Sequence, residues 1–353
     1  MLRDDVEHDA PPGNTAADGG SSSTTLQGAG FWLLRIVLPV RGGRWLTGTL
    51  IFAVLLLVFL LVNGIEGGAG RMSVGVTLFF CILLAYIVPV HHLIMERSLN
   101  ALTQLVGSFP DRADDIALCR RQILYKPGLR VAAAIGAGLV AGVAHNALLF
   151  ADGQLTDTLS NAASMLSMSI TLLTWVIMTA VIASLLENAV RFARLGARVH
   201  VDVLSIRALT PFGSIAVSST LAMIGAQAAF PTMFLDDDVH WVTFVPGLIA
   251  TAIPMVALLV LPIWPVHGRM LRSKRDALNR VNRDIARLTR EPPTAGNAYA
   301  ELEPLLVYRR EVAGASEWPF DTSVVSRLGL YLIIPPLTWV GAALIEILVE
   351  TAI

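Results

Sequence analysis

The sequence has little charge and almost no cysteine. Only 15% of its 353 residues are charged, whereas a typical soluble domain has about 25%. Hydrophobic residues make up 54%, and the mean hydropathy is +0.64. These values exclude an ordinary soluble globule and indicate an integral membrane protein. The net charge is -1, so no overall basic field would attract nucleic acid, and we expect no nucleic-acid partner.

Cysteine and lysine are each present only twice. Cys81 lies in an apolar run and Cys119 in a charged segment, so we expect no disulfide framework. Lys126 and Lys274 are the only lysines, and the remaining basic residues are arginines. This bias is typical of GC-rich bacterial genomes and predicts a bacterial source. Arginine's affinity for phosphate and carboxylate groups is the alternative explanation.

Catalytic motifs are also missing. The chain contains no CxxC, HExxH, GxSxG or Walker A pattern, and its polar segments are too short for a soluble catalytic domain. We therefore expect no enzyme, no catalytic residues, no metal and no cofactor. An intramembrane enzyme acting on lipid is the weakest hypothesis, because only His145, Glu346 and a run of aspartates could serve it.

Long apolar runs dominate the rest of the chain. Residues 1–30 are polar and rich in Gly and Ser, which predicts a disordered cytoplasmic tail, and 31–45 predict an interfacial amphipathic segment. Seven runs of about 17 to 25 residues follow, each long enough to cross a bilayer as a helix. We predict an all-α polytopic membrane bundle with transmembrane helices at 46–63, 74–90, 131–150, 165–186, 212–230, 242–266 and 328–349.

The placement of basic residues predicts the orientation. Every Lys and Arg except Arg71 falls in the N-terminal tail or in the connections 91–130, 187–211 and 267–327. The other connections are acidic or neutral. This is the positive-inside pattern, and it predicts a cytoplasmic N-terminus, an external C-terminus and a location in the bacterial inner membrane.

Two similar stretches suggest an internal repeat. IVPVHHLIMERSLNAL (87–102) and IWPVHGRMLRSKRDAL (263–278) each end an apolar run and begin a charged helix. They predict a parallel 3+3 helix repeat around a linking fourth helix, with His91 and His267 in equivalent places beside His92. The alternative is that any helix leaving a bilayer favours a proline, an interfacial histidine and then charges.

The second charged helix predicts a cytoplasmic helical hairpin at 267–317. Leu271, Leu278, Val281, Ile285 and Leu288 form a seam, EPPTAGN breaks the helix, and an acidic arm returns from about Tyr299 to Gly314. Either the hairpin is a solvated connector, or its basic face binds a protein partner or anionic lipid. The candidate binding residues are Arg269, Arg272, Lys274, Arg275, Arg280, Arg283 and Arg287.

A second candidate site lies near the outer ends of the spans. Carboxylate, imidazole and amide groups there could bind a cation or a polar solute, or could simply be solvated. Its members are His145, Asn146, Gln227, Asp236, Asp237, Asp238, His240 and Glu346. Glu346 is the only formal charge inside a predicted span, which counts against an ion-coupled transporter.

Small residues and prolines predict the packing of the bundle. Gly138 and Gly142 form a GxxxG step, which allows two helices to approach closely. Prolines should make the sixth predicted span irregular, and Pro335 and Pro336 should kink the seventh.

Two functional hypotheses follow. The first is a non-enzymatic sensor or scaffold that acts on a partner through the hairpin, and the alternative is a transporter or channel for a small solute or ion. The expected partners are membrane lipids and a cytoplasmic or membrane protein, and a second copy of the chain is a further candidate.

Overall fold

The structure, a computed structural model, describes residues 31–40, 42–65, 72–149, 161–203, 206–235, 241–290 and 298–319, with 329, 330 and 333. Within these ranges the regular elements are helices, and there is no strand. The predicted disordered tail at 1–30 lies outside them. The helices are α2 (Gly43–Ile65), α3 (Val74–Ser108), α4 (Ala113–Leu124), α5 (Gly128–Leu149), α7 (Ala162–Gly196), α8 (Thr210–Gln227), α9 (Trp241–Arg290) and α10 (Ala298–Gly314). Short 3-10 turns include η1 (Trp32–Arg35), η4 (Ile206–Leu209) and η5 (Phe230–Leu235).

Six of these helices are long and apolar enough to cross a membrane. They are α2, α3, α5, α7, α8 and α9, and they match the first six predicted spans, although α5 and α8 end before the last residues of the third and fifth. The prediction of a multi-pass helical membrane protein is therefore confirmed. The seventh predicted span, 328–349, falls almost wholly outside the described residues. The count of seven, the N-in orientation and the internal repeat consequently stay predictions.

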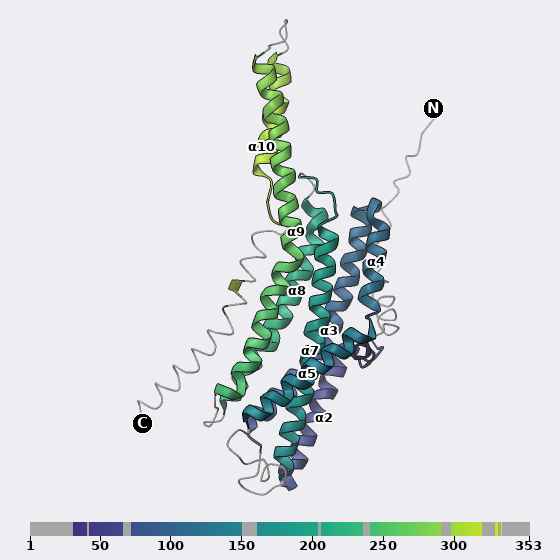
Figure 1. Cartoon of the computed structure of the whole chain (residues 1–353), viewed down its shortest axis with the longest axis vertical. Coiled ribbons are helices and arrows are strands. Elements are labelled where there is room, and N and C mark those ends of the chain that lie inside the picture. Colours follow the sequence, from purple (N-terminus) through teal and green to yellow (C-terminus); the bar gives the residue numbers. More distant parts are fainter. Residues whose placement is uncertain are drawn as a thin grey trace, which may run out of the picture.

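The helices lie side by side, and one pair projects far beyond the others (Figure 1). That pair is the C-terminal half of α9 with α10, and we call the bundle end from which it projects the hairpin end. The C-terminal ends of α3 and α7 lie at the hairpin end too, and α4 runs back from this end along the bundle to the start of α5 (Figure 1).

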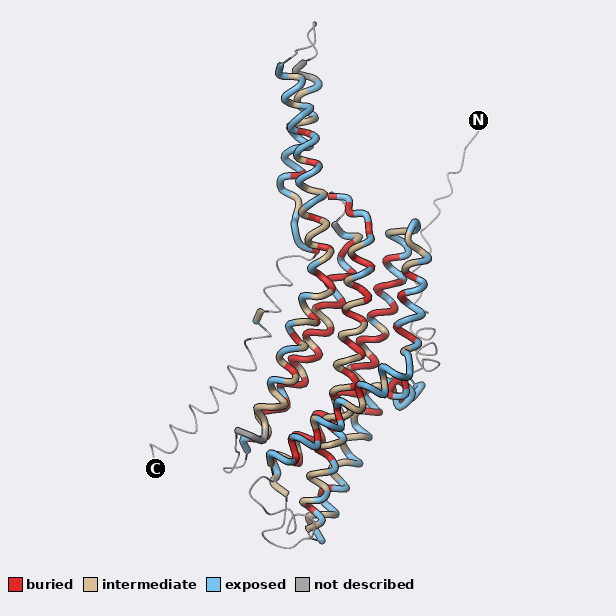
Figure 2. The backbone as a smooth tube through the Cα atoms, in the orientation of Figure 1, coloured by how far each residue is buried: buried red, intermediate tan, exposed pale blue. Residues whose placement is uncertain are grey.

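Burial separates central helices from peripheral ones. About half of the most apolar stretch is buried in α3, α7 and α8, at 56% each, against 11% in α2 and 17% in α9. Figure 2 shows that the buried positions lie where the helices of the bundle face one another. The hairpin, in contrast, is mostly exposed. The exposed apolar faces of α2, α5 and α9 are the surfaces that hydrocarbon would cover.

Glycines set the closest contact between two helices. A Cβ atom added at Gly138 would lie 2.7 Å from Cα of Val176 on α7, and one at Gly142 would lie 3.1 Å from Cα of Leu172. Both positions therefore require glycine if α5 is to rest on the backbone of α7. The predicted role of the GxxxG step is confirmed.

Helix α9 is continuous although it contains four prolines. Pro246, Pro254, Pro262 and Pro265 all lie inside a single 50-residue helix. The prolines do not break the helix, although its axis changes direction along its length (Figure 1). A helix in a membrane tolerates proline because neighbouring helices and local adjustments can satisfy the freed carbonyl groups. The predicted irregularity of span six therefore takes the form of a change in axis direction within an unbroken helix.

Candidate functional site

The hairpin is built from the distal half of α9 and from α10. Ala277 of α9 and Val312 of α10 are buried together with Val203, which lies in the connection after α7. The base of the hairpin is fastened by Lys274, whose Nζ donates to the carbonyl of Ala315 at 2.9 Å and lies 3.2 Å from Glu317. Because the apolar contact and the polar contacts lie on the same side of α9, the hairpin has a fixed base.

Aromatic stacking adds to this base. The rings of His267 and Trp318 are stacked with centroids 4.0 Å apart, and Nδ1 of His267 lies 2.6 Å from the carbonyl oxygen of Glu317. Glu317 and Trp318, which follow α10, thus close the base of the hairpin against α9. His267 is thus a structural residue at the junction of bundle and hairpin.

The seven basic residues proposed as a binding face divide into two groups. Arg269 donates to the carbonyl of Ala197, and Lys274 holds the base, so both serve the fold. The other five are exposed, and among the described residues none of them pairs with a carboxylate. They are Arg272, Arg275, Arg280, Arg283 and Arg287. Five unpaired guanidinium groups on one arm form a surface that can bind carboxylates or phosphates.

An open, polar groove runs along this arm. It is lined by Arg272 and Arg280 of α9, by Tyr308 of α10 and by His200 and Asp202. Apolar side chains are exposed next to it on α10, where Leu306 is 46% and Val307 is 51% exposed. Arginine and aromatic residues beside exposed apolar groups are typical of protein interfaces.

A second polar feature lies where α5 meets α7 at the hairpin end. Glu187 of α7 accepts from Arg191 at 3.1 Å, lies 3.7 Å from Nζ of Lys126, and lies 3.9 Å from Arg130. The side chains of Lys126 and Arg191 are 3% and 7% exposed. Lys126 also donates to the carbonyl of Ser184 at 3.0 Å. We call Lys126, Arg130, Glu187 and Arg191 the charged cluster.

Burial dominates the electrostatics of Lys126. It lowers the pKa of the ammonium from its ordinary 10.5 to about 7, with Glu187 acting in the opposite direction and Arg191 adding to the decrease. The ring of Phe31, just before η1, lies 5.9 Å from the ammonium and covers it. Phe31 is 2% exposed, so the segment before α2 is folded against the bundle at this point.

The sequence did not single out the charged cluster. The sequence does contain one indication of the cluster. Glu187 and Arg191 follow an apolar run directly and are four residues apart, which is the spacing of an ion pair on a helix. Lys126, however, lies 61 residues before Glu187, and only the packing of α5 on α7 brings the two together. A strongly shifted pKa next to a charge partner is a common property of functional sites.

The histidines near the hairpin end contact different partners. Nε2 of His91 lies 3.0 Å from Oγ of Ser184, and the ring packs 5.3 Å from that of Phe31. His92 is buried beside it at 5% exposure. His91 and His267 were predicted to occupy equivalent places, but they have different neighbours in the structure.

The predicted outer polar site is divided by the fold. His145 accepts from the indole of Trp175 at 2.7 Å, and Asn146 donates to the carbonyl of Met168 at 3.2 Å. Gln227 donates instead to Thr251 of α9 at 3.2 Å. His145 and Asn146 thus join α5 to α7, whereas Gln227 joins α8 to α9. Asp236, Asp237, Asp238, His240 and Glu346 lie outside the described residues. Within the described ranges, no group of three or more His, Cys, Asp and Glu could hold a metal ion.

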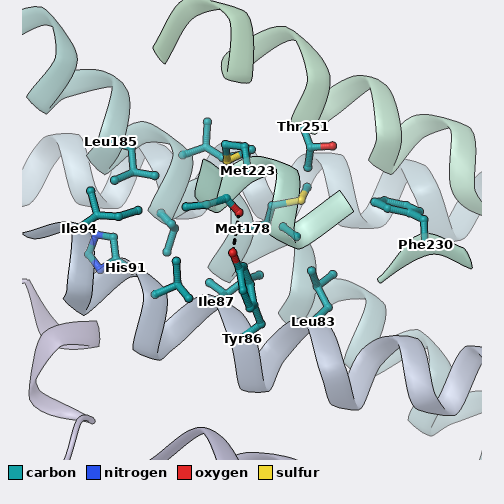
Figure 3. A pocket seen from close by; sticks show the side chains of 15 residues that line it. Leu83, Tyr86, Ile87, His91, Ile94, Met178, Leu185, Met223, Phe230 and Thr251 are labelled. Carbon is teal, nitrogen blue, oxygen red and sulfur yellow. Dashed lines mark hydrogen bonds between the residues drawn. The ribbon is translucent and has the colours of Figure 1, made fainter. Parts of the chain in front are cut away.

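Two small cavities lie inside the bundle. One, of about 40 Å³, lies where α3, α7, α8 and α9 meet, and Figure 3 shows Tyr86 and His91 at its wall with Met178, Met223 and Thr251. The hydroxyl of Tyr86 donates across it to the carbonyl of Ala222 at 3.1 Å. The other, of about 70 Å³, is lined by His145 and Trp175 among mostly apolar residues. Each has room for only a few water molecules.

Comparison of the chain with protein-family models, with curated proteins and with solved structures found no match. The function of the protein must therefore be inferred from the geometry of its sites.

Proposed function

We propose that the protein is a non-enzymatic, multi-pass protein of the bacterial inner membrane that acts as a sensor or scaffold through its hairpin. The N-terminus and the hairpin would lie in the cytoplasm. The observation that carries the proposal is the exposed basic arm of α9, which stands clear of the bundle on a fixed base.

The position of the arm favours a protein partner over lipid headgroups. Arg280 and Arg287 lie 14 and 21 residues beyond Val266, where the sixth apolar run ends. At 1.5 Å per residue these side chains lie about 21 and 32 Å along the helix axis. The Debye length at physiological ionic strength is about 8 Å, so headgroups of the same membrane would attract the distal arginines only weakly. An acidic protein surface is the partner that fits.

The interior of the bundle supports this proposal over the transport hypothesis. The two cavities described above are small and mostly apolar, and neither is a path for a hydrated ion. A solute transporter would need a further conformation in which these helices separate. Uptake of a solute into liposomes that contain the purified protein, above that of empty liposomes, would favour transport instead.

A photocrosslinking experiment tests the proposed partner surface. A photoreactive amino acid replaces Asn279, which lines the basic arm beside Arg280 and is itself uncharged. The control places the same group at Gln122, an exposed amide on α4. We expect one protein to be crosslinked from position 279 in intact cells and not from position 122. Crosslinking to lipid alone, or equal products at both positions, would contradict the proposal.

A further inference from the structure

The charged cluster carries more positive than negative charge. Three cationic side chains, Lys126, Arg130 and Arg191, lie within 4 Å of a single carboxylate, that of Glu187. Two of the cations are almost fully buried. Because three basic side chains share one carboxylate, the cluster has an excess of positive charge, and an anion close to it would be stabilised.

Neighbouring acidic residues do not supply the missing charge. Glu96 is engaged by Arg44 at 2.6 Å, and Asp115 lies 3.1 Å from Arg198 and 3.5 Å from Arg112. Among the described residues, no other carboxylate lies within ion-pair distance of the cluster. An anionic ligand bound here would offset the excess positive charge of the cluster.

The cluster opens toward the surface that a membrane would cover. Arg130 is on the first turn of α5, and its side chain is 62% exposed. Leu129 beside it is 82% exposed, and the exposed apolar face continues along the same helix through Val140 and Val143. Gly136 lies between them in open space, which leaves this face flat. An anion bound at Arg130 would thus have an apolar helix face directly beside it.

We propose that the charged cluster binds the phosphate of an anionic phospholipid in the leaflet at the hairpin end, with an acyl chain along the exposed face of α5. Basic sites between helices on the cytoplasmic side are suited to such headgroups. The phosphate contacts Arg130 first and approaches Lys126 and Arg191 behind it. Tyr125, which is 63% exposed, lies at the boundary where aromatic side chains are enriched in membrane proteins. This site is independent of the partner surface on the hairpin.

Native mass spectrometry of the full chain in neutral detergent tests the site. Phosphatidylglycerol and phosphatidylcholine with equal acyl chains are titrated separately, and inorganic phosphate is added as a competitor. The test variant is Arg130→Gln, which removes an exposed charge and should fold. The control is Arg121→Gln, which removes an exposed arginine at the same bundle end that forms no described ion pair.

We expect the wild type to retain phosphatidylglycerol in preference to phosphatidylcholine. Arg130→Gln should weaken phosphatidylglycerol binding by about fivefold, the effect of one basic side chain near an anionic surface. Arg121→Gln should bind as the wild type does. Equal retention of the two lipids, equal loss in both variants, or unchanged binding in Arg130→Gln would each overturn the proposal. Displacement of the lipid by inorganic phosphate at matched concentration would also overturn it, because the site would then take a free anion.

Discussion

Replacing Gly138 with alanine should separate two helices that now touch through their backbones. The new Cβ would lie 2.7 Å from Cα of Val176 and 3.0 Å from the carbonyl oxygen of Trp175. Ordinary contacts of this kind begin near 3.4 Å, and neither atom belongs to a side chain that can rotate away. Helix α5 must therefore move from α7 by several tenths of an ångström. Overpacking of this kind typically costs about 1–3 kcal/mol.

Gly136 provides the matched control for this substitution. It lies two residues earlier on the same helix, and a Cβ there would meet nothing within 4 Å. Gly136→Ala should be neutral, or more stable by up to about 1 kcal/mol because alanine favours a helix. The free energy of unfolding of both variants can be measured in mixed detergent micelles. Equal stability of Gly138→Ala and Gly136→Ala would refute the close-approach argument.

Two further predictions concern the charged cluster. Glu187→Gln removes the only carboxylate of the charged cluster and should lower the free energy of unfolding by about 2–3 kcal/mol. This loss is smaller than that for a fully buried pair because the side chain of Glu187 is 23% exposed. Glu317→Gln, at the exposed hairpin base, should lower the free energy of unfolding by at most about 1 kcal/mol. An equal loss of stability in the two variants would contradict the claim that Glu187 holds buried cations. The second prediction concerns pH: because the folded-state pKa of Lys126 is lowered to about 7, the unfolded chain binds more protons between pH 7 and 10. Stability should therefore rise with pH in that window, by up to about 1.4 kcal/mol per unit, and should rise less in Lys126→Gln. Chemical unfolding of the two proteins at pH 7, 8 and 9 measures this slope, and identical slopes would contradict the buried-lysine account.

Local patterns were sufficient to predict most of the described fold. Hydropathy alone located the helices that match the first six runs, since each run is longer than the hydrocarbon layer requires. The GxxxG step predicted a close approach of two helices, and the structure shows that the partner of α5 is α7. The seam of α9 likewise predicted a partner helix, and α10 packs there.

Other features depend on which helices pack against each other, and the local sequence patterns do not predict these pairings. The charged cluster joins Lys126 to Glu187 through the packing of α5 against α7. His145 and Gln227 occupy similar depths on their helices but hydrogen-bond to α7 and α9 respectively, so the expected common site does not form from them. The basic residues of the arm were predicted to bind a partner as one set. In the structure, however, Arg269 and Lys274 donate hydrogen bonds to backbone carbonyl groups of the protein itself.

The most direct test of the central claim is purification of the protein from its native host in mild detergent, with mass spectrometry of the co-purifying proteins. Charge reversal at Arg280, Arg283 and Arg287 is compared with reversal at Arg120, Arg121 and Arg310, which are also exposed but lie outside the basic arm. The account predicts one stoichiometric partner that is lost only when the arm is reversed, with membrane insertion unchanged in both variants. A partner retained after reversal of the arm, or a wild-type protein that purifies with lipid alone, would contradict it.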